Sequence, residues 1–337
     1  MIDSRYEMVE AWLNTFPLSA REERTINLSR NINKTEGTIE QYTAMEAEFF
    51  KRMPFCNIST DTRKIRFADT ATELIDNIFR KEVDDDTLVV VSDMEHPSVI
   101  NNYTKVKHCL QLNFHKDISC LNIYKVISEA KKYKKIFIYI IGTSISSGEI
   151  TPQCFYSQLK KELVKLNIPH VMVLDDVHGM FFVPRDYSIF DYVVYTAHAC
   201  INMYDMGMLI SKDGDIGTKI YNDGMDYISM LDVILNRKEK IFNFYYVMQH
   251  FFEKWLANPH FNLLSNNTSH LFSMQTHNCM FVQEIHDKID EYDIRLEGNG
   301  TGTNFILIRN ARFIKTPHWL IPGLQLIEKY LPYLYLG

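Results

Sequence analysis

"KKIFIYIIGTSISSGEITPQCFYSQLKKELVKLNIPHVMVLDD", residues 134–176, is the stretch of sequence that decides the fold class. It contains two short, unbroken apolar runs, at 136–141 and 171–174, and an amphipathic segment at 154–167 lies between them. A short unbroken apolar run is typical of a strand that is buried on both faces. The amphipathic segment predicts a helix that crosses from one strand to the next. The stretch therefore predicts one strand–helix–strand unit of a parallel sheet.

The same alternation continues on both sides of this unit. A strand and a helix are predicted at 64–81, a buried strand at 87–93 with a turn and a helix after it, and a further strand at 192–199. Repeated units of this kind predict an α/β fold, in which helices cover both faces of a mainly parallel sheet.

The chain of 337 residues is long enough for more than one domain. We expect an N-terminal helical segment at 1–50, a large domain at 51–215, connecting helices at 216–260 and a small C-terminal α+β domain at 261–337. In the small domain, strands are predicted at 279–285 and 304–311 and a last helix at 319–331.

Composition and charge exclude several classes of partner. The net charge is −6 and no basic block is present, which argues against nucleic acid. The sequence contains neither a secretion signal nor an apolar run long enough to span a membrane, so we expect a cytoplasmic protein with no membrane partner. Its six cysteines show no C-x-x-C pair and no spacing typical of metal ligands, which indicates a reducing compartment and no metal site. We expect most of them in the core.

Polar residues follow four of the predicted strands or their turns. Ligands of open parallel sheets bind beyond the carboxyl ends of the strands, so these positions are the first place to look for a site. Each position alone has a simpler explanation, as a helix cap, a turn residue or a solvated loop. The candidates are Thr70, Ala71, Thr72, His96, Asp175, Asp176, His178, Thr196 and His198.

Four short motifs occur in a definite order, namely "TATE" at 70–73, "EHPS" at 95–98, "DDVH" at 175–178 and "TAHA" at 196–199. As an ordered set they resemble the motifs of the fold type I pyridoxal-phosphate enzymes, in particular the class V aminotransferase and cysteine desulfurase branch. The resemblance covers about residues 60–215, and more loosely the tail as far as Arg309. It implies a large domain with a seven-stranded, mainly parallel sheet, a small C-terminal α+β domain, and pyridoxal phosphate as the cofactor.

The resemblance also implies a role for each motif residue. Asp175 would pair with the ring nitrogen, His96 would stack on the ring face, and His178 would contact the phenolic oxygen. The residues that would hold the phosphate are Ala71, Thr72, Thr196 and His198. The implied partner is an amino-acid substrate, whose carboxylate would bind Arg309, with Arg312 as the alternative.

Ala199 lies where this family carries the lysine that forms a Schiff base with the cofactor. That lysine holds the cofactor aldehyde and later moves the proton of the substrate's α-carbon, and a methyl group does neither. One explanation is a laboratory lysine-to-alanine variant of an aminotransferase or lyase that acts through an external aldimine. The alternatives are a natural lysine-free pseudoenzyme that serves in binding or protein interaction, and a natural enzyme that uses a pre-formed aldimine. We favour the variant, because the other cofactor-binding positions keep suitable residue types.

Other positions depart from the family pattern. Ile145 stands where an asparagine is common, so Thr143, Ser144 or Ser146 would have to replace its hydrogen bond, and Asp69 stands where the phosphate loop often has glycine. The segment 295–304 contains no cysteine, which disfavours desulfuration. Transamination, elimination, decarboxylation and epimerisation remain open. The resemblance also implies a homodimer, with candidates for interface residues at Tyr221, Gly224 and Tyr227.

Overall fold

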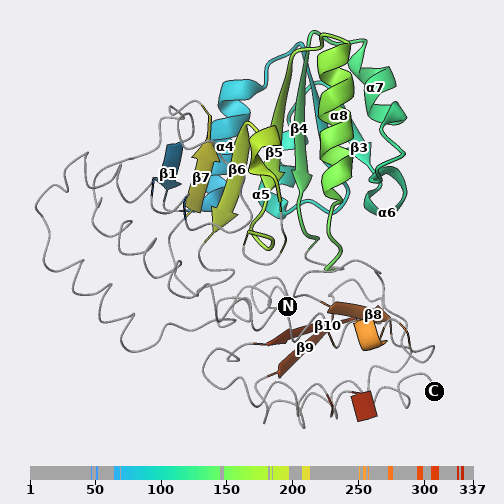
Figure 1. The fold of residues 1–337 in the computed structure, drawn as a ribbon. Coiled ribbons are helices and arrows are strands. Elements are labelled where there is room, and N and C mark those ends of the chain that lie inside the picture. The colour runs from blue at the N-terminus through green and yellow to red at the C-terminus, as the bar shows by residue number, and fades with distance from the viewer. Residues whose placement is uncertain are drawn as a thin grey trace, which may run out of the picture.

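The structure is a computed structural model (Figure 1). It describes residues 64–68, 70–144, 148–180, 183, 185–196 and 207–212, the strands at 272–275, 294–298 and 305–310, and isolated helical residues at 47, 51, 250, 253–255, 257, 325, 328 and 329.

A seven-stranded sheet organises residues 64–211. Its strands, in spatial order, are β1 (Lys64–Ala68), β7 (Gly207–Ser211), β6 (Tyr192–Thr196), β5 (His170–Asp175), β4 (Lys135–Ile141), β2 (Thr87–Ser92) and β3 (Cys109–Leu112). The pairs β6–β5, β5–β4, β4–β2 and β2–β3 are parallel, whereas β7 is antiparallel to both β6 and β1. The predicted seven-stranded, mainly parallel sheet is therefore confirmed.

Helices cover both faces of this sheet. In Figure 1, α4 (Ala71–Glu82) lies behind the sheet and α8 (Gln153–Lys165) lies in front of it. The remaining helical elements are α5 (Pro97–Tyr103), α6 (Phe114–Asp117), α7 (Tyr124–Ala130) and the 3-10 turn η1 (Tyr187–Ile189). The helices predicted within 64–81 and 154–167, and the one after the turn at His96, are confirmed.

Each of the two long helices buries one apolar stripe. In α4 the buried residues are Leu74, Ile75, Ile78 and Phe79, and in α8 they are Phe155, Tyr156, Leu159 and Leu163. The spacing of three and four residues places each set on one side of its helix, where it packs against the sheet. Because this packing leaves an apolar stripe in the sequence, the alternation of strands and amphipathic helices indicates the fold class.

A second, three-stranded sheet is formed by β8 (Phe272–Gln275), β10 (Phe305–Asn310) and β9 (Ile294–Gly298), in the order β8-β10-β9. Both pairs are antiparallel. β10 confirms the strand predicted at 304–311. The predicted strand at 279–285 and the predicted helices at 1–50, 216–260 and 319–331 lie largely or wholly outside the described residues.

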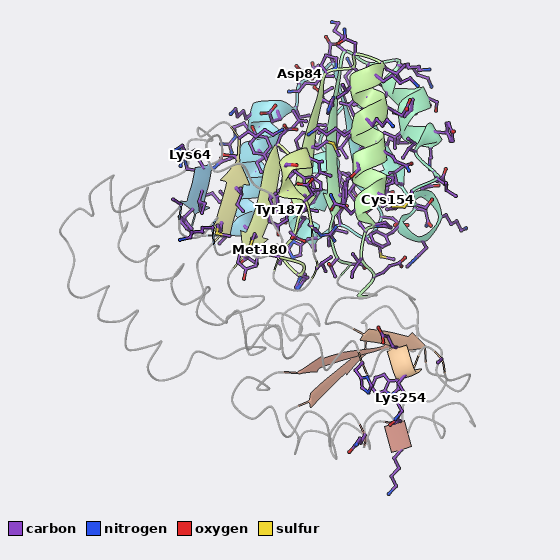
Figure 2. The ribbon with its side chains drawn as sticks, viewed as in Figure 1. Lys64, Asp84, Cys154, Met180, Tyr187 and Lys254 are labelled. Atoms are coloured by element: carbon purple, nitrogen blue, oxygen red, sulfur yellow. A yellow bond between two sulfur atoms is a disulfide. The ribbon has the colours of Figure 1, made fainter. Side chains whose placement is uncertain are left out.

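The expectation that most cysteines lie in the core is wrong for the three that the structure describes, and the expectation that they are reduced is wrong for two of these. Cys120 and Cys154 form a disulfide with a Cα–Cα distance of 5.2 Å, and Cys109 is exposed. Cys154 lies at the start of α8, so the bond joins this helix to the segment between α6 and α7 (Figure 2). In the described part of the chain no helix has the length and apolar character needed to cross a membrane. Nor do three His, Cys, Asp or Glu residues gather there as metal ligands would.

Candidate functional site

The predicted residues that the structure describes within 70–196 lie at one edge of the seven-stranded sheet, beyond the carboxyl ends of its parallel strands. In Figure 2, Met180, which follows β5, lies at this edge, whereas Asp84, which precedes β2, lies at the opposite end. The register makes Asp175 the partner of Ile141 on one side and of Val194 on the other. The end of β5 is therefore flanked by the ends of β4 and β6.

Asp175 is the last residue of β5, and only 3% of it is exposed. Its Oδ2 accepts a hydrogen bond from the Tyr139 hydroxyl at 3.0 Å, and its Oδ1 accepts one from the Val177 N–H at 3.3 Å. Burial raises the pKa of Asp175 to about 6, although these two hydrogen bonds act in the opposite direction. No basic side chain forms an ion pair with Asp175 within the described residues, so its negative charge is available to a cationic ligand.

Both carboxylate oxygens of Asp176, the next residue, accept hydrogen bonds from side chains of the protein. The Arg185 Nε donates to its Oδ1 at 3.1 Å and the Tyr187 hydroxyl donates to its Oδ2. Arg185 also donates to the carbonyl oxygen of Thr151 at 3.0 Å. Burial raises the pKa of Asp176, and the positive charge of Arg185 opposes that shift. Of two adjacent aspartates, one is thus paired internally and the other is not.

The start of α4 lies at the same edge. The Thr70 hydroxyl caps this helix by accepting from the Glu73 N–H at 3.1 Å. The N–H groups of Ala71 and Thr72, in the first turn, have no hydrogen-bond partner among the described residues, as is normal for a helix start. Such N–H groups, together with the helix dipole, form a ready site for an anion.

Gly207 holds this helix start against the sheet. It is the register partner of Thr196 in β6 and of Ala68 in β1. A Cβ on Gly207 would lie 2.5 Å from the carbonyl carbon and oxygen of Thr70 and 2.6 Å from the Ala71 nitrogen. The backbone at the start of α4 therefore contacts the first residue of β7, next to the end of β6.

His96 follows β2 and caps α5. Its Nδ1 accepts from the Ser98 N–H at 3.2 Å and lies 2.8 Å from the Ser98 Oγ. The residue as a whole is exposed, yet the protein around its ring desolvates it and lowers its pKa, which favours the neutral ring at pH 7. The capping bonds fix the orientation of the ring.

Three side chains that shape this edge were not predicted from the sequence. Tyr139 orients Asp175, Arg185 neutralises Asp176, and Glu95 is a buried carboxyl group one residue before His96. A signal for two of them is present in the sequence. Tyr139 is the only side chain with a polar atom in the run 136–141, and Glu95 closely follows a wholly apolar strand core.

No family model matches the chain, and no curated protein matches it either. Several solved structures, however, are similar to it. The NifS-like protein of Rickettsia africae is 15% identical at a TM-score of 0.68, over 94% of this chain and 98% of that one. A lysine-to-alanine variant of the S. paucimobilis serine palmitoyltransferase, with bound pyridoxal phosphate and myriocin, is 12% identical at 0.68, over 94% and 84%. A lysine-to-alanine variant of C-DES, with glycine covalently linked to its pyridoxal phosphate, is 13% identical at 0.66, over 94% of both.

The chain has the fold of the fold type I pyridoxal-phosphate enzymes. This confirms the fold class expected from the four motifs. At identities of 11–15% the likeness shows the fold and not the chemistry.

The structure describes some of the remaining predicted residues and not others. His178 is 4% exposed in the turn after β5, and Thr196, which ends β6, is 2% exposed. Thr143, just after β4, is 1% exposed, and its hydroxyl has no hydrogen-bond partner among the described residues. Arg309 lies on β10 opposite Arg295. The predicted positions outside the described residues are Asp69, Ile145, Ser146, His198, Ala199, Tyr221, Gly224, Tyr227 and Arg312.

Proposed function

We propose that the chain binds pyridoxal phosphate at the carboxyl edge of its seven-stranded sheet and that this site acts on an amino acid. The observation that supports this most is Asp175, a buried carboxylate without a basic partner among the described residues. The start of α4 adds N–H donors at the same edge. Pyridoxal phosphate carries a protonated ring nitrogen and an anionic phosphate, so one acceptor and one set of donors fit its two ends.

The register supports this pairing of acceptor and donors. Asp175 is level with Val194, and Thr196 lies two residues further along β6. With a rise of about 3.3 Å per residue and strands about 4.8 Å apart, the Cα atoms of Asp175 and Thr196 are roughly 8 Å apart. Side chains alternate along a strand, so both residues face the α4 side of the sheet, as Val194 does. A single small ligand spans such a distance.

In this proposal the carboxylate of Asp175 keeps the proton on the ring nitrogen, and His96 covers one ring face. The N–H groups of Ala71 and Thr72 bind the phosphate, together with Thr196 and His198. When bound, the cofactor supplies an electron sink for negative charge that develops at the amino acid's α-carbon. His178 contacts the phenolic oxygen of the cofactor in this proposal. The desolvated, neutral ring of His96 suits a stacking role better than a charged ring would.

Arg309 is the proposed partner of the substrate carboxylate, and Ala199 is proposed to stand in place of the reactive lysine. With Ala199 the chain has no amine at this position to move the α-proton, which makes it an inactive form of an aminotransferase or lyase. The serine palmitoyltransferase and C-DES structures are also lysine-to-alanine variants, and each contains pyridoxal phosphate. This supports retention of the cofactor without covalent attachment.

The test is titration with pyridoxal phosphate, followed by quenching of tryptophan fluorescence and by absorbance. We expect Asp175→Asn to weaken binding by roughly 10- to 100-fold, as expected for a hydrogen bond to a charged group. Asp86→Asn is the matched control, because Asp86 is exposed and pairs with Lys134 at the opposite end of the sheet. If the chain does not bind at millimolar cofactor, the proposal is wrong and the alternative of a cofactor-free binding protein is favoured. If Asp175→Asn binds as tightly as Asp86→Asn, Asp175 does not hold the cofactor.

A second variant tests the position of Ala199. Ala199→Lys should give a yellow protein with an absorption band in the visible range, and borohydride should convert the attachment into a stable bond that mass spectrometry detects. A lysine at this position that stays unmodified would show that the missing amine lies elsewhere.

We further propose that the protein is a homodimer in the cytoplasm, as the resemblance and the sequence imply. Sedimentation equilibrium decides the first point, since a monomer at micromolar concentration would contradict it. The Cys120–Cys154 disulfide bears on the second point. Cells are lysed in an alkylating agent, and mass spectrometry then shows whether Cys120 and Cys154 are alkylated, as reduced cytoplasmic thiols would be, or joined to each other.

A further inference from the structure

Glu95 is a buried carboxyl group to which the proposed chemistry assigns no role. It follows β2 directly before His96, and only 6% of the residue is exposed. Its Oε1 accepts from the Ser92 N–H at 3.1 Å, from the Ser92 hydroxyl at 2.6 Å and from the Ile141 N–H at 3.0 Å. A buried polar group without such bonds would be strongly destabilising, so these three donors account for its burial.

The donors belong to two different strands. Ser92 ends β2 and Ile141 ends β4, whereas the register pairs between these strands run only as far as Val90 and Ile138. Glu95 therefore joins the two strands beyond their last paired residues.

This connection leads directly to the proposed site. Ile141 is the register partner of Asp175, and His96 is the residue next to Glu95. One carboxyl group thus joins the turn that carries the predicted ring-stacking histidine to the strand beside the predicted ring-nitrogen partner.

Resting on the proposed function, we propose that Glu95 is a positioning residue that sets the spacing between His96 and Asp175. Its carboxyl group acts as a hydrogen-bond acceptor of fixed length rather than as a charge. Burial, together with the nearby charge of Asp175, raises the pKa of Glu95 to about 8, which keeps the group neutral at pH 7. All three donors contact Oε1, so the acid proton of the neutral group is on Oε2, which has no partner among the described residues.

Three substitutions separate length from charge. Glu95→Gln keeps the length and the acceptor oxygen, Glu95→Asp shortens the side chain by one methylene, about 1.5 Å, and Glu95→Ala removes the acceptor. Asp93→Ala is the matched control, because the Asp93 carboxylate accepts from the Phe114 N–H at 2.8 Å and from the Asn113 side chain at 2.8 Å, on the side of the turn away from β4.

The first readout needs no cofactor. NMR spectra of the His96 ring, recorded with a Ser98→Ala sample to assign the resonance, report the position of the histidine in the free protein. We expect Glu95→Asp and Glu95→Ala to shift this resonance and Glu95→Gln and Asp93→Ala to leave it in place. If Glu95→Ala leaves the resonance unchanged, or if Glu95→Gln moves it as far as Glu95→Ala does, the proposed role is wrong.

The second readout is the affinity for pyridoxal phosphate. A displaced His96 or Asp175 loses part of its contact with the cofactor, and one hydrogen bond to a charged group accounts for roughly tenfold or more in affinity. We therefore expect Glu95→Asp and Glu95→Ala to bind at least about tenfold more weakly and Glu95→Gln to bind within about threefold of the unaltered chain. Equal affinity for all variants would overturn the role of Glu95. Failure of the unaltered chain to bind would instead overturn the proposed function, and the NMR spectra would then decide the role of Glu95 on their own.

Discussion

Replacement of Gly207 by alanine tests how the start of α4 is held in place. The new Cβ would lie 2.5 Å from the carbonyl atoms of Thr70 and 2.6 Å from the Ala71 nitrogen, whereas ordinary contacts begin at 3.4 Å. The contacting atoms are helix backbone, which cannot rotate away as a side chain can. The helix start must therefore retreat by about 0.8–0.9 Å, and overpacking of this kind costs about 1–3 kcal/mol of folding free energy.

The assay combines urea unfolding with titration by pyridoxal phosphate. With a slope near 2 kcal/mol per molar urea, we expect the midpoint to fall by roughly 1 M. The affinity should fall by about tenfold or more, because the N–H donors of Ala71 and Thr72 move with the helix and a lost hydrogen bond to a charged group costs about 1.5–3 kcal/mol. The control is Met208→Leu, which changes the next, fully buried residue of β7 but conserves its volume. If Gly207→Ala unfolds and binds as the unaltered chain does, Gly207 does not hold the helix start.

Three further predictions concern stability. The pKa of Glu95 is raised from 4.5 to about 8 in the folded state, so the unfolded state releases this proton at lower pH. The free energy of unfolding should therefore fall by a few kcal/mol as pH rises from about 4.5 to 8. Glu95→Gln should reduce this pH dependence, as measured by urea unfolding at pH 5 and pH 8. Arg185→Met leaves the buried Asp176 without its cation and should destabilise by about 3–5 kcal/mol, and Asp176→Asn in the same chain should recover part of the loss. Reduction of the Cys120–Cys154 disulfide, which closes a loop across 34 positions, should lower the unfolding free energy by about 4 kcal/mol, and an unchanged midpoint with dithiothreitol would contradict this.

The fold class was predictable because five of the seven strands in the large sheet have a strong local signal. β2, β4, β5 and β6 are short apolar runs, and a helix with one apolar stripe follows β1. These patterns arise from burial on both faces of the sheet, which the sequence records directly.

The strands β3 and β7 were not predicted, for two different reasons. β3 is an edge strand whose residues are mostly exposed or half-buried, so its sequence lacks a continuous apolar run. β7 is fully buried but antiparallel, and an antiparallel neighbour needs no crossover helix before it. The pattern of alternating strands and helices therefore does not indicate β7.

The ends of β5 and β6 and the start of α4 could be located from the motifs, but the contacts of the candidate side chains could not. Nothing in the doublet of Asp175 and Asp176 shows which aspartate is paired internally, because Arg185 reaches Asp176 only after the chain has folded. The link from Glu95 to Ile141 joins residues 46 positions apart and has no local signature.

The pairing of Thr196 with Gly207 has a consequence for how this protein can change over time. These two residues are neighbours across adjacent strands, although ten positions of the sequence, among them Ala199, separate them. The register of β7 is fixed by its pairs with β6 and β1 and by the contact of Gly207 with α4. None of these contacts involves a residue between 197 and 206, so evolution or a designer can exchange residues at those positions without removing any of them.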